Sequence, residues 1–200
     1  MGKQLIISIG REFGSAGHEI GELLAQKYNI PLLDNTLLAK VSEEKSIDLA
    51  TLKKYDERPK NKLFSRTVAG HSNSIEDSVA HMQFDYLKKL AGMGQSFVIV
   101  GRCAEHVLKE YRDNMVSIFV LGDIPSKCKR IMRLYKLNED DAKKMMKKQD
   151  WARKSYHNYY CKGKWGDSRN YDMCINSSLI GLEGTINVVA QFVKEKTGIE

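Results

Sequence analysis

The chain alternates between short apolar runs and longer stretches in which apolar residues recur with helical spacing. The apolar runs are Leu5–Ile9, Pro31–Leu33, Phe97–Val100, Val116–Leu121 and Met173–Ile175. Most of them are apolar at every position, which is typical of strands that are buried on both faces of a parallel sheet. The pattern therefore predicts a five-stranded parallel sheet.

The stretches between these runs have apolar residues three or four positions apart, which indicates helices. Helices are predicted at Ile20–Tyr28, Thr36–Glu44, Ile75–Ala91, Ala104–Tyr111, Pro125–Tyr135, Glu139–Tyr160 and Gly181–Lys196. Strands that alternate with helices in this way predict a three-layer α/β/α fold with right-handed crossovers. We treat residues 1–200 as a single domain.

In an α/β fold of this kind, ligands bind at the carboxyl ends of the parallel strands. Four polar or glycine-rich segments follow predicted strands and should meet at that edge: Gly10–Gly17, Asp34, Gly101–Arg102 and Gly122–Asp123. We therefore expect one ligand site, built from several loops.

Two segments do not follow the simple alternation. Ser46–Asn73 is polar and contains the sequence DERPKNK, so we expect an irregular excursion between helices. Asn138–Asp167 begins with a helix N-cap residue and an acidic first turn, and then becomes strongly basic and aromatic. The second segment is the more informative one, because its charge differs from that of the rest of the chain.

Positive charge is concentrated in residues 127–169, which we call the basic region. The whole chain carries a formal net charge of +7. The basic region contains 14 Lys and Arg against 5 Asp and Glu, so it carries +9 and the remainder −2. Such a segment on a nearly neutral body indicates an anionic partner, either the phosphates of a small molecule or a nucleic-acid backbone.

Composition also bears on location and on metal binding. No apolar run approaches the roughly 20 residues that a membrane-spanning helix needs. The four cysteines are Cys103, Cys128, Cys161 and Cys174, and they show neither a CxxC pair nor the spacing of metal ligands. With no recognisable secretion signal, we expect reduced thiols, a cytoplasmic location and no metal-ligating residues.

The sequence GREFGSAGHEI, Gly10–Ile20, lies between a predicted strand and a predicted helix. Gly14 and Gly17 give the backbone access to conformations that let an anion approach the main chain, and the helix that follows offers free N–H groups. A standard phosphate-binding loop continues with Lys and then Ser or Thr, whereas this chain has His18 and Glu19. The spacing alone fits either an anion site or a structural turn.

The missing lysine raises the question of which cation would face the phosphates. Arg11 lies at the start of the loop, and His18 is only partly charged near its ordinary pKa of about 6.5. Arg102 follows the strand in FVIVGRC. Its guanidinium either forms an ion pair at the surface or binds a phosphate. Arg130 and Arg153 of the basic region are further candidates.

Five ordered blocks of the sequence carry a resemblance to a known family. They are ISIGREFGSAGHEIGELLAQKYNIPLLDNTLL, FVIVGRCAEHVL, VSIFVLGDIPSKCKRIM, KKQDWARKSYHNYY and WGDSRNYDMCINSSLIGLEGTINVV. Together they extend over almost the whole chain, which resembles the cytidylate kinase-like family, related to the nucleoside monophosphate kinases. The resemblance implies a P-loop fold with a helical lid insertion, and places the lid in residues 127–169.

The resemblance also implies roles for matching residues. The phosphate-binding loop would comprise Gly14, Ser15, Ala16, Gly17, His18 and Glu19. Residues 35–92 would form a helical acceptor-binding region that opens at Asp34, with Arg102 as the acceptor-binding arginine. Cys103 stands where true cytidylate kinases carry an Asp that reads cytosine.

The same resemblance assigns the lid and the adenine site. Arg130, Asp150 and Arg153 would belong to the lid that closes over the transferred phosphoryl group, with His18 beside them. Asn176, Ser177 and Ser178 would lie where the adenine of ATP is held.

These observations leave three functional interpretations. The first is an ATP-dependent kinase that uses Mg²⁺ and a nucleoside monophosphate or another small phosphorylated acceptor. The second is a catalytically degenerate module that binds a nucleotide, which the His18–Glu19 sequence motivates. The third, which we disfavour, is a nucleic-acid-binding protein. The sequence leaves a monomer and a homodimer equally open.

Overall fold

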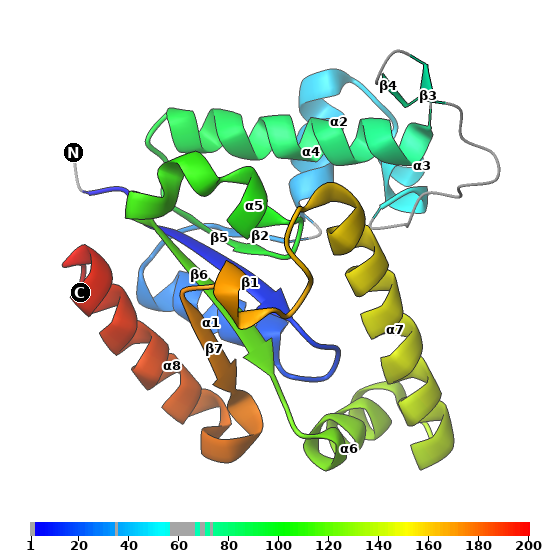
Figure 1. The fold of residues 1–200 in the computed structure, drawn as a ribbon, viewed down its shortest axis with the longest axis vertical. Coiled ribbons are helices and arrows are strands. Elements are labelled where there is room, and N and C mark those ends of the chain that lie inside the picture. The colour runs from blue at the N-terminus through cyan, green and yellow to red at the C-terminus, as the bar shows by residue number, and fades with distance from the viewer. Residues whose placement is uncertain (1–2, 35, 57–66, 69–70, 73) are drawn as a thin grey trace.

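The predicted five-stranded parallel sheet is confirmed. The computed structural model describes residues 3–34, 36–56, 67–68, 71–72 and 74–200. The strands of the sheet are β1 (Ile6–Arg11), β2 (Leu32–Leu33), β5 (Phe97–Val100), β6 (Met115–Leu121) and β7 (Met173–Asn176). They are all parallel and lie in the order β2-β5-β1-β6-β7 (Figure 1).

Helices cover both faces of this sheet. The helices are α1 (Gly17–Lys27), α2 (Thr36–Lys45), α3 (Leu49–Lys54), α4 (Ile75–Gly92), α5 (Ala104–Val107), α6 (Ile124–Tyr135), α7 (Glu139–Tyr160) and α8 (Ser177–Thr197), with short 3₁₀ helices η1 (Lys109–Asn114) and η2 (Ser168–Asn170). Helices α1 and α8 pack on one face, and α4 and α5 pack on the other, so the three-layer prediction is also confirmed.

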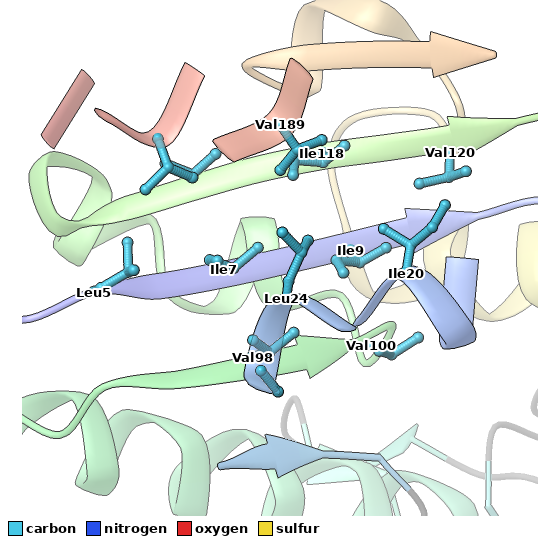
Figure 2. Packing of buried hydrophobic residues seen from close by; sticks show 13 residues of the cluster. Leu5, Ile7, Ile9, Ile20, Leu24, Val98, Val100, Ile118, Val120 and Val189 are labelled. Atoms are coloured by element: carbon cyan, nitrogen blue, oxygen red, sulfur yellow. The ribbon is translucent and has the colours of Figure 1, made fainter. Parts of the chain in front are cut away.

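Alternate residues of the central strands supply the two cores. Ile7 and Ile9 of β1 are fully buried against α1 and α8, and Val98 and Val100 lie beside them in register on β5 (Figure 2). Ile6 points the opposite way, into the core beneath α4 and α5. Burying each such side chain contributes about 1.5–3 kcal/mol, so the continuous apolar runs determine the centre of the fold.

Two predicted helices differ from the structure by four residues at one end, whereas the other helices agree within three residues at each end. The helix predicted at Ala104–Tyr111 ends at Val107 and gives way to η1, because a tighter 3₁₀ path turns the chain into β6 within a few residues. The helix predicted from Gly181 begins at Ser177. Gly181 has φ 68° and ψ −174°, a conformation that interrupts the helix and that glycine adopts without strain.

The segment Ser46–Asn73 is more ordered than the sequence predicts. It contains α3, which the Asp48 side chain caps by accepting a hydrogen bond from the Thr51 amide at 2.8 Å. It also contains a short antiparallel pair, β3 (Thr67–Val68) and β4 (His71–Ser72). A six-residue helix is too short to show periodicity, so the expectation of an irregular segment was wrong for these parts; residues 57–66, 69–70 and 73 lie outside the described residues.

The basic region forms a pair of helices at the carboxyl edge of the sheet. Helices α6 and α7 stand beyond the arrowheads of β1 and β6 (Figure 1) and pack on each other through Cys128, Ile131, Ala142 and Met146. The fold thus places the positive charge where ligands of α/β proteins bind. Within the described residues, no helix has the length and apolar character needed to cross a membrane.

Candidate functional site

A cleft of about 520 Å³ opens at the carboxyl edge of the sheet. Its walls come from the loop between β1 and α1, from the segment after β2, from the end of β5, and from α6 and α7. Four arginines line it: Arg11, Arg102, Arg130 and Arg153. Residues that are up to 142 positions apart in the sequence therefore meet around one space.

The loop between β1 and α1 presents backbone amides to this cleft. Gly14 has φ +88°, and Ala16 caps α1 in the left-handed region at φ 64°. The first hydrogen bond of the helix runs from the Ile20 amide to the Ala16 carbonyl at 2.9 Å, so the amides of residues 17–19 precede it. Free amides at the positive end of a helix dipole suit a phosphate group.

Buried hydrogen bonds hold the loop in this shape. The Ser15 side chain is buried, and its hydroxyl donates to the Glu12 and Val120 carbonyls at 2.9 and 3.0 Å. The Ser177 hydroxyl in turn donates to the Ser15 carbonyl at 2.7 Å. Ser15 therefore belongs to the loop through its backbone, while its hydroxyl fastens the loop to β6.

A buried lysine that the sequence did not identify forms an ion pair with a glutamate of the loop between β1 and α1. Lys127, at the start of α6, places its Nζ 2.7 Å from the Glu12 carboxylate, which also accepts a hydrogen bond from the Gly122 amide at 3.1 Å. Lys127 is not among the residues that line the cleft. Since 115 residues separate Lys127 from Glu12, no local pattern in the sequence identifies the pair.

His18 lines the cleft with its imidazole directed toward carboxylates. Its Nε2 lies 2.8 Å from the Asp34 carboxylate, and its Nδ1 lies 3.6 Å from that of Glu22. The ring is half-exposed and joins the start of α1 to the segment after β2. His18 therefore lies on the Asp34 side of the cleft, where Glu22 is a neighbour that sequence reasoning did not identify.

Glu19 forms an ion pair with a residue of the basic region. Its carboxylate forms an ion pair with the Arg130 guanidinium of α6. Burial and the neighbouring Arg133 lower the pKa of Arg130, although an arginine remains protonated in proteins. The residue that stands in place of the usual Ser or Thr thus pairs with a cation of α6 at the start of α1.

Arg102 follows β5 in a strained turn. Gly101, Arg102 and Cys103 have φ values of 84°, 60° and 54°, and a run of left-handed residues that includes two side chains is energetically costly. The Arg102 side chain is 4% exposed and forms a two-pronged ion pair with Asp56, with Nη2 2.9 Å from Oδ2. The sequence predicted the arginine, whereas its partner Asp56 was missed.

Helix α7 contacts the loop through Asp150 and Arg153. The Asp150 carboxylate accepts a hydrogen bond from the Phe13 amide at 2.6 Å, and burial raises the pKa of this carboxyl. The Arg153 guanidinium lies over the Phe13 ring, 5.3 Å from its centre, and donates to the Arg11 carbonyl at 3.4 Å. The Asp-x-x-Arg pair therefore binds α7 to residues 11–13.

The three residues assigned to adenine lie apart from the cleft lining. Asn176 caps α8 by accepting a hydrogen bond from the Ser178 amide at 3.0 Å. The Ser178 hydroxyl accepts from the Asp123 amide at 3.0 Å. Together with Ser177, these residues bind the start of α8 to the loop and to the end of β6, and none of the three lines the cleft.

The donor set of the cleft fits Mg²⁺. Carboxylates of Glu19, Glu22 and Asp34 line it beside the phosphate-binding loop. Mg²⁺ prefers oxygen ligands and is usually held by one or two carboxylates together with substrate phosphates and water. The residues present are therefore compatible with a metal that arrives with a nucleotide.

Comparison with other sequences gives a family and two curated relatives. The model described as the cytidylate kinase-like family matches residues 6–179. The cytidylate kinase of Methanococcus vannielii is 25% identical over 195 residues, which cover 95% of this chain and 100% of the relative. That of Methanocaldococcus jannaschii is 24% identical over 192 residues, covering 94% of this chain and 97% of the relative.

Solved structures share the fold. An uncharacterized protein from Eubacterium ventriosum has a TM-score of 0.76 at 38% identity, covering 96% of this chain and 99% of its own. The shikimate kinase of Bacteroides thetaiotaomicron has a TM-score of 0.56 at 13% identity, covering 95% and 98% of the two chains. The second likeness concerns the fold alone.

Proposed function

This chain belongs to the cytidylate kinase-like family, and on that premise we propose that it is an ATP-dependent phosphotransferase. The acceptor would be a nucleoside monophosphate or another small phosphorylated molecule. The observation that carries the proposal is the convergence of four arginines from four segments on a cleft whose floor is an amide-lined loop. Such a cleft suits two phosphate-bearing substrates held close together.

Phosphoryl transfer demands mainly positioning and electrostatic stabilisation from a protein. The amides of residues 14–18 would hold the phosphates of ATP. Arg130 and Arg153 would supply the positive charge that a loop lysine supplies in standard P-loops, with Arg11 at the edge of the loop. Glu19, Glu22 and Asp34 are the residues that would hold a Mg²⁺ ion, which would supply positive charge beside the phosphates.

The acceptor would bind beside Asp34 and Arg102. An arginine fork is suited to a phosphate, and Asp56 occupies that fork in this structure. Because an acceptor phosphate is already anionic, the reaction needs no general base. Cys103 stands where cytidylate kinases have an Asp, so we do not assign the base of the acceptor.

The direct test is an ADP-release assay with ATP, Mg²⁺ and a panel of acceptors. The panel should contain the common nucleoside monophosphates and other phosphorylated metabolites. We expect ADP release that depends on at least one acceptor. No acceptor-dependent turnover with any of them, at high enzyme concentration, would refute the proposal.

A substitution at the lid tests the mechanism. Arg153→Ala should lower kcat by about 10²-fold or more while changing ATP affinity little, because a cation on the developing charge acts mainly in the transition state. Lys154→Ala, at an exposed neighbouring position, is the matched control and should leave kcat unchanged. Equal losses of kcat and ATP affinity in Arg153→Ala would argue against a role in the transition state.

The ion pair between Glu19 and Arg130 favours a second candidate, a nucleotide-binding module without catalysis. In that case ATP would raise the melting temperature of the protein by mass action, with no turnover in the acceptor panel. His18→Lys separates the two candidates further, because it restores one standard element while Glu19 stays. Turnover that appears only in His18→Lys would select the binding module.

A further inference from the structure

Outside the cleft, the structure gathers four potential metal ligands that lie in two pairs in the sequence. Cys103 and Glu105 flank the start of α5, and His157 and Cys161 lie at the end of α7. One ligand atom from each of Glu105, His157 and Cys161 lies within 4.8 Å of the others. The His157 Nε2 is 2.6 Å from the Glu105 carboxylate, and the Cys103 and Cys161 thiols are hydrogen-bonded to each other.

This cluster is buried on all sides. The four residues are each 4–8% exposed. A buried carboxylate and imidazole are costly to remove from water, and two thiols beside them add little apolar packing. A metal ion bound between Glu105, His157 and Cys161 would satisfy these three groups at once.

A small cavity adjoins the cluster. It measures about 20 Å³ and is lined by Cys103, Glu105 and His157 together with Arg102 and Arg153. A volume of about 10–15 Å³ is enough to hold one water molecule, so the cavity has room for a single small ion beside the cluster. The cavity also brings the cluster next to two of the arginines of the phosphotransfer cleft.

We propose that Glu105, His157 and Cys161, with Cys103 as the fourth ligand, form a binding site for a transition-metal ion such as Zn²⁺. Zn²⁺ is usually held by four ligands drawn from thiolates, imidazoles and carboxylates, and this set contains all three kinds. Soft thiolates and an imidazole exclude Mg²⁺ as the preferred ion. The site is separate from the Mg²⁺-compatible carboxylates of the cleft.

The position of the site indicates what the metal would do. Arg153 and His157 are four residues apart on one face of α7, and Cys161 directly follows the last residue of the helix. On the other side, Arg102 directly precedes Cys103 in the strained turn after β5. An ion between these elements would fix α7 against the sheet and so position the two arginines relative to each other. Its role would be structural, because the cluster does not line the cleft.

The test uses the reduced, tag-free full chain, freed of metal by chelation, and titrated with Zn²⁺ or with Co²⁺ as a spectroscopic probe. We expect one ion per chain, a thiolate-to-cobalt charge-transfer band, and a melting temperature raised by about 5–10 °C when Zn²⁺ is a hundredfold above its Kd. Cys161→Ser should abolish the band or weaken binding by about tenfold or more.

Two cysteine variants outside the cluster serve as controls for Cys161→Ser. Cys174→Ser, at an exposed position, and Cys128→Ser, at a buried one, should bind Co²⁺ like the unmodified chain. If Cys161→Ser does not fold, Glu105→Gln takes its place, with the same expected loss of affinity. The proposal is overturned if the reduced chain binds no Zn²⁺, or if the affinity is unchanged in folded Cys161→Ser or Glu105→Gln. Metal binding is measured without ATP, so its outcome is independent of the proposed kinase activity.

Discussion

Gly14 is constrained both by its backbone conformation and by the space around it. Its φ is +88°, and a Cβ there would lie 3.1 Å from the Lys127 carbonyl oxygen and 3.2 Å from the Ile131 side chain. Gly14→Ala should therefore destabilise the chain by about 1–2 kcal/mol and, by moving the loop, weaken ATP binding. Calorimetric titration with ATP and thermal unfolding measure the two effects.

Gly94 offers a matched control for this substitution. It has φ +73°, but no atom lies within 4 Å of a Cβ placed there. Gly94→Ala should reproduce the backbone cost while leaving ATP affinity unchanged. If both variants bound ATP like the parent chain, the loop would not be the phosphate site.

Burial in the folded chain disfavours the ionised form of the Asp150 carboxyl. Burial raises the pKa of its carboxyl above the unfolded value, so the folded chain binds this proton more tightly than the unfolded chain does. The cost of the charge is fully present above the raised pKa and disappears as the pH falls below about 4. Asn at this position keeps an acceptor for the Phe13 amide without the charge.

We therefore expect Asp150→Asn to melt at a higher temperature than the parent chain at pH 7, with the difference vanishing near pH 4. Asp150→Ala should instead lose about 1 kcal/mol, because the Phe13 amide loses its acceptor. Melting curves at the two pH values distinguish these cases. A lower melting temperature for Asp150→Asn at pH 7 would show that the charge itself stabilises the contact.

At the scale of elements, the pairing of Asp56 after α3 with Arg102 after β5 joins the α2–α3 segment to the sheet. Asp56→Asn would remove the counter-charge that Asp56 supplies to a buried guanidinium, which costs about 3 kcal/mol or more. Added phosphate or acceptor should restore part of this loss, so its effect on the melting temperature should be larger in Asp56→Asn than in the parent chain.

Asp85→Asn, at an exposed position on α4, is the control and should change neither stability nor the response to phosphate. An equal response to phosphate in Asp56→Asn and the parent chain would mean that Arg102 is a structural residue only.

The predictability of the elements differs according to their length and surroundings. The central strands were identified because burial on both faces favours nearly continuous apolar runs, which β5 has throughout and which only Ser8 and Ser117 interrupt in the buried parts of β1 and β6. Helix α7 was identified to the residue, because its N-cap Asn138 and acidic first turn are local signals. Helix α3 and the 3₁₀ helix η1 were missed, since short elements depend on contacts that lie outside their own sequence.

At the scale of the molecule, the strong positive charge has two possible partners, and the packing of the aromatic residues distinguishes them. Tyr156 and Tyr160 pack with Phe84 and with each other, and Trp165 packs edge-on against Phe119. Trp151 and Tyr159 remain exposed. Most rings that could stack on bases are thus turned into the protein, which favours a cleft for small anions over a single-strand binding surface.

This packing predicts little binding to nucleic acid. A variant with Lys147, Lys148 and Lys154 changed to Gln should keep ATP affinity within about twofold, because all three side chains are exposed. At about 0.15 M salt neither protein should be retained on immobilised single-stranded oligonucleotides. Retention of the parent chain alone under these conditions would contradict the prediction and favour nucleic-acid binding.

The sequence by itself determined the sheet, the family and the place of the glycine-rich loop between β1 and α1. Each of these depends on local patterns: apolar runs, the Gly14-x-x-Gly17 spacing, and ordered blocks along the chain. The tertiary structure determined which charged side chains form ion pairs with each other. It paired Lys127 with Glu12, Asp56 with Arg102, and His157 with Glu105, across separations that carry no sequence signal.

The physical reason is that a side chain's partner depends on how the whole chain folds, whereas its propensity for helix or strand depends on its neighbours. The four cysteines illustrate this difference. Their spacing indicated isolated thiols, and only the packing of the end of α7 on the start of α5 brought Cys103 and Cys161 together with a histidine and a glutamate.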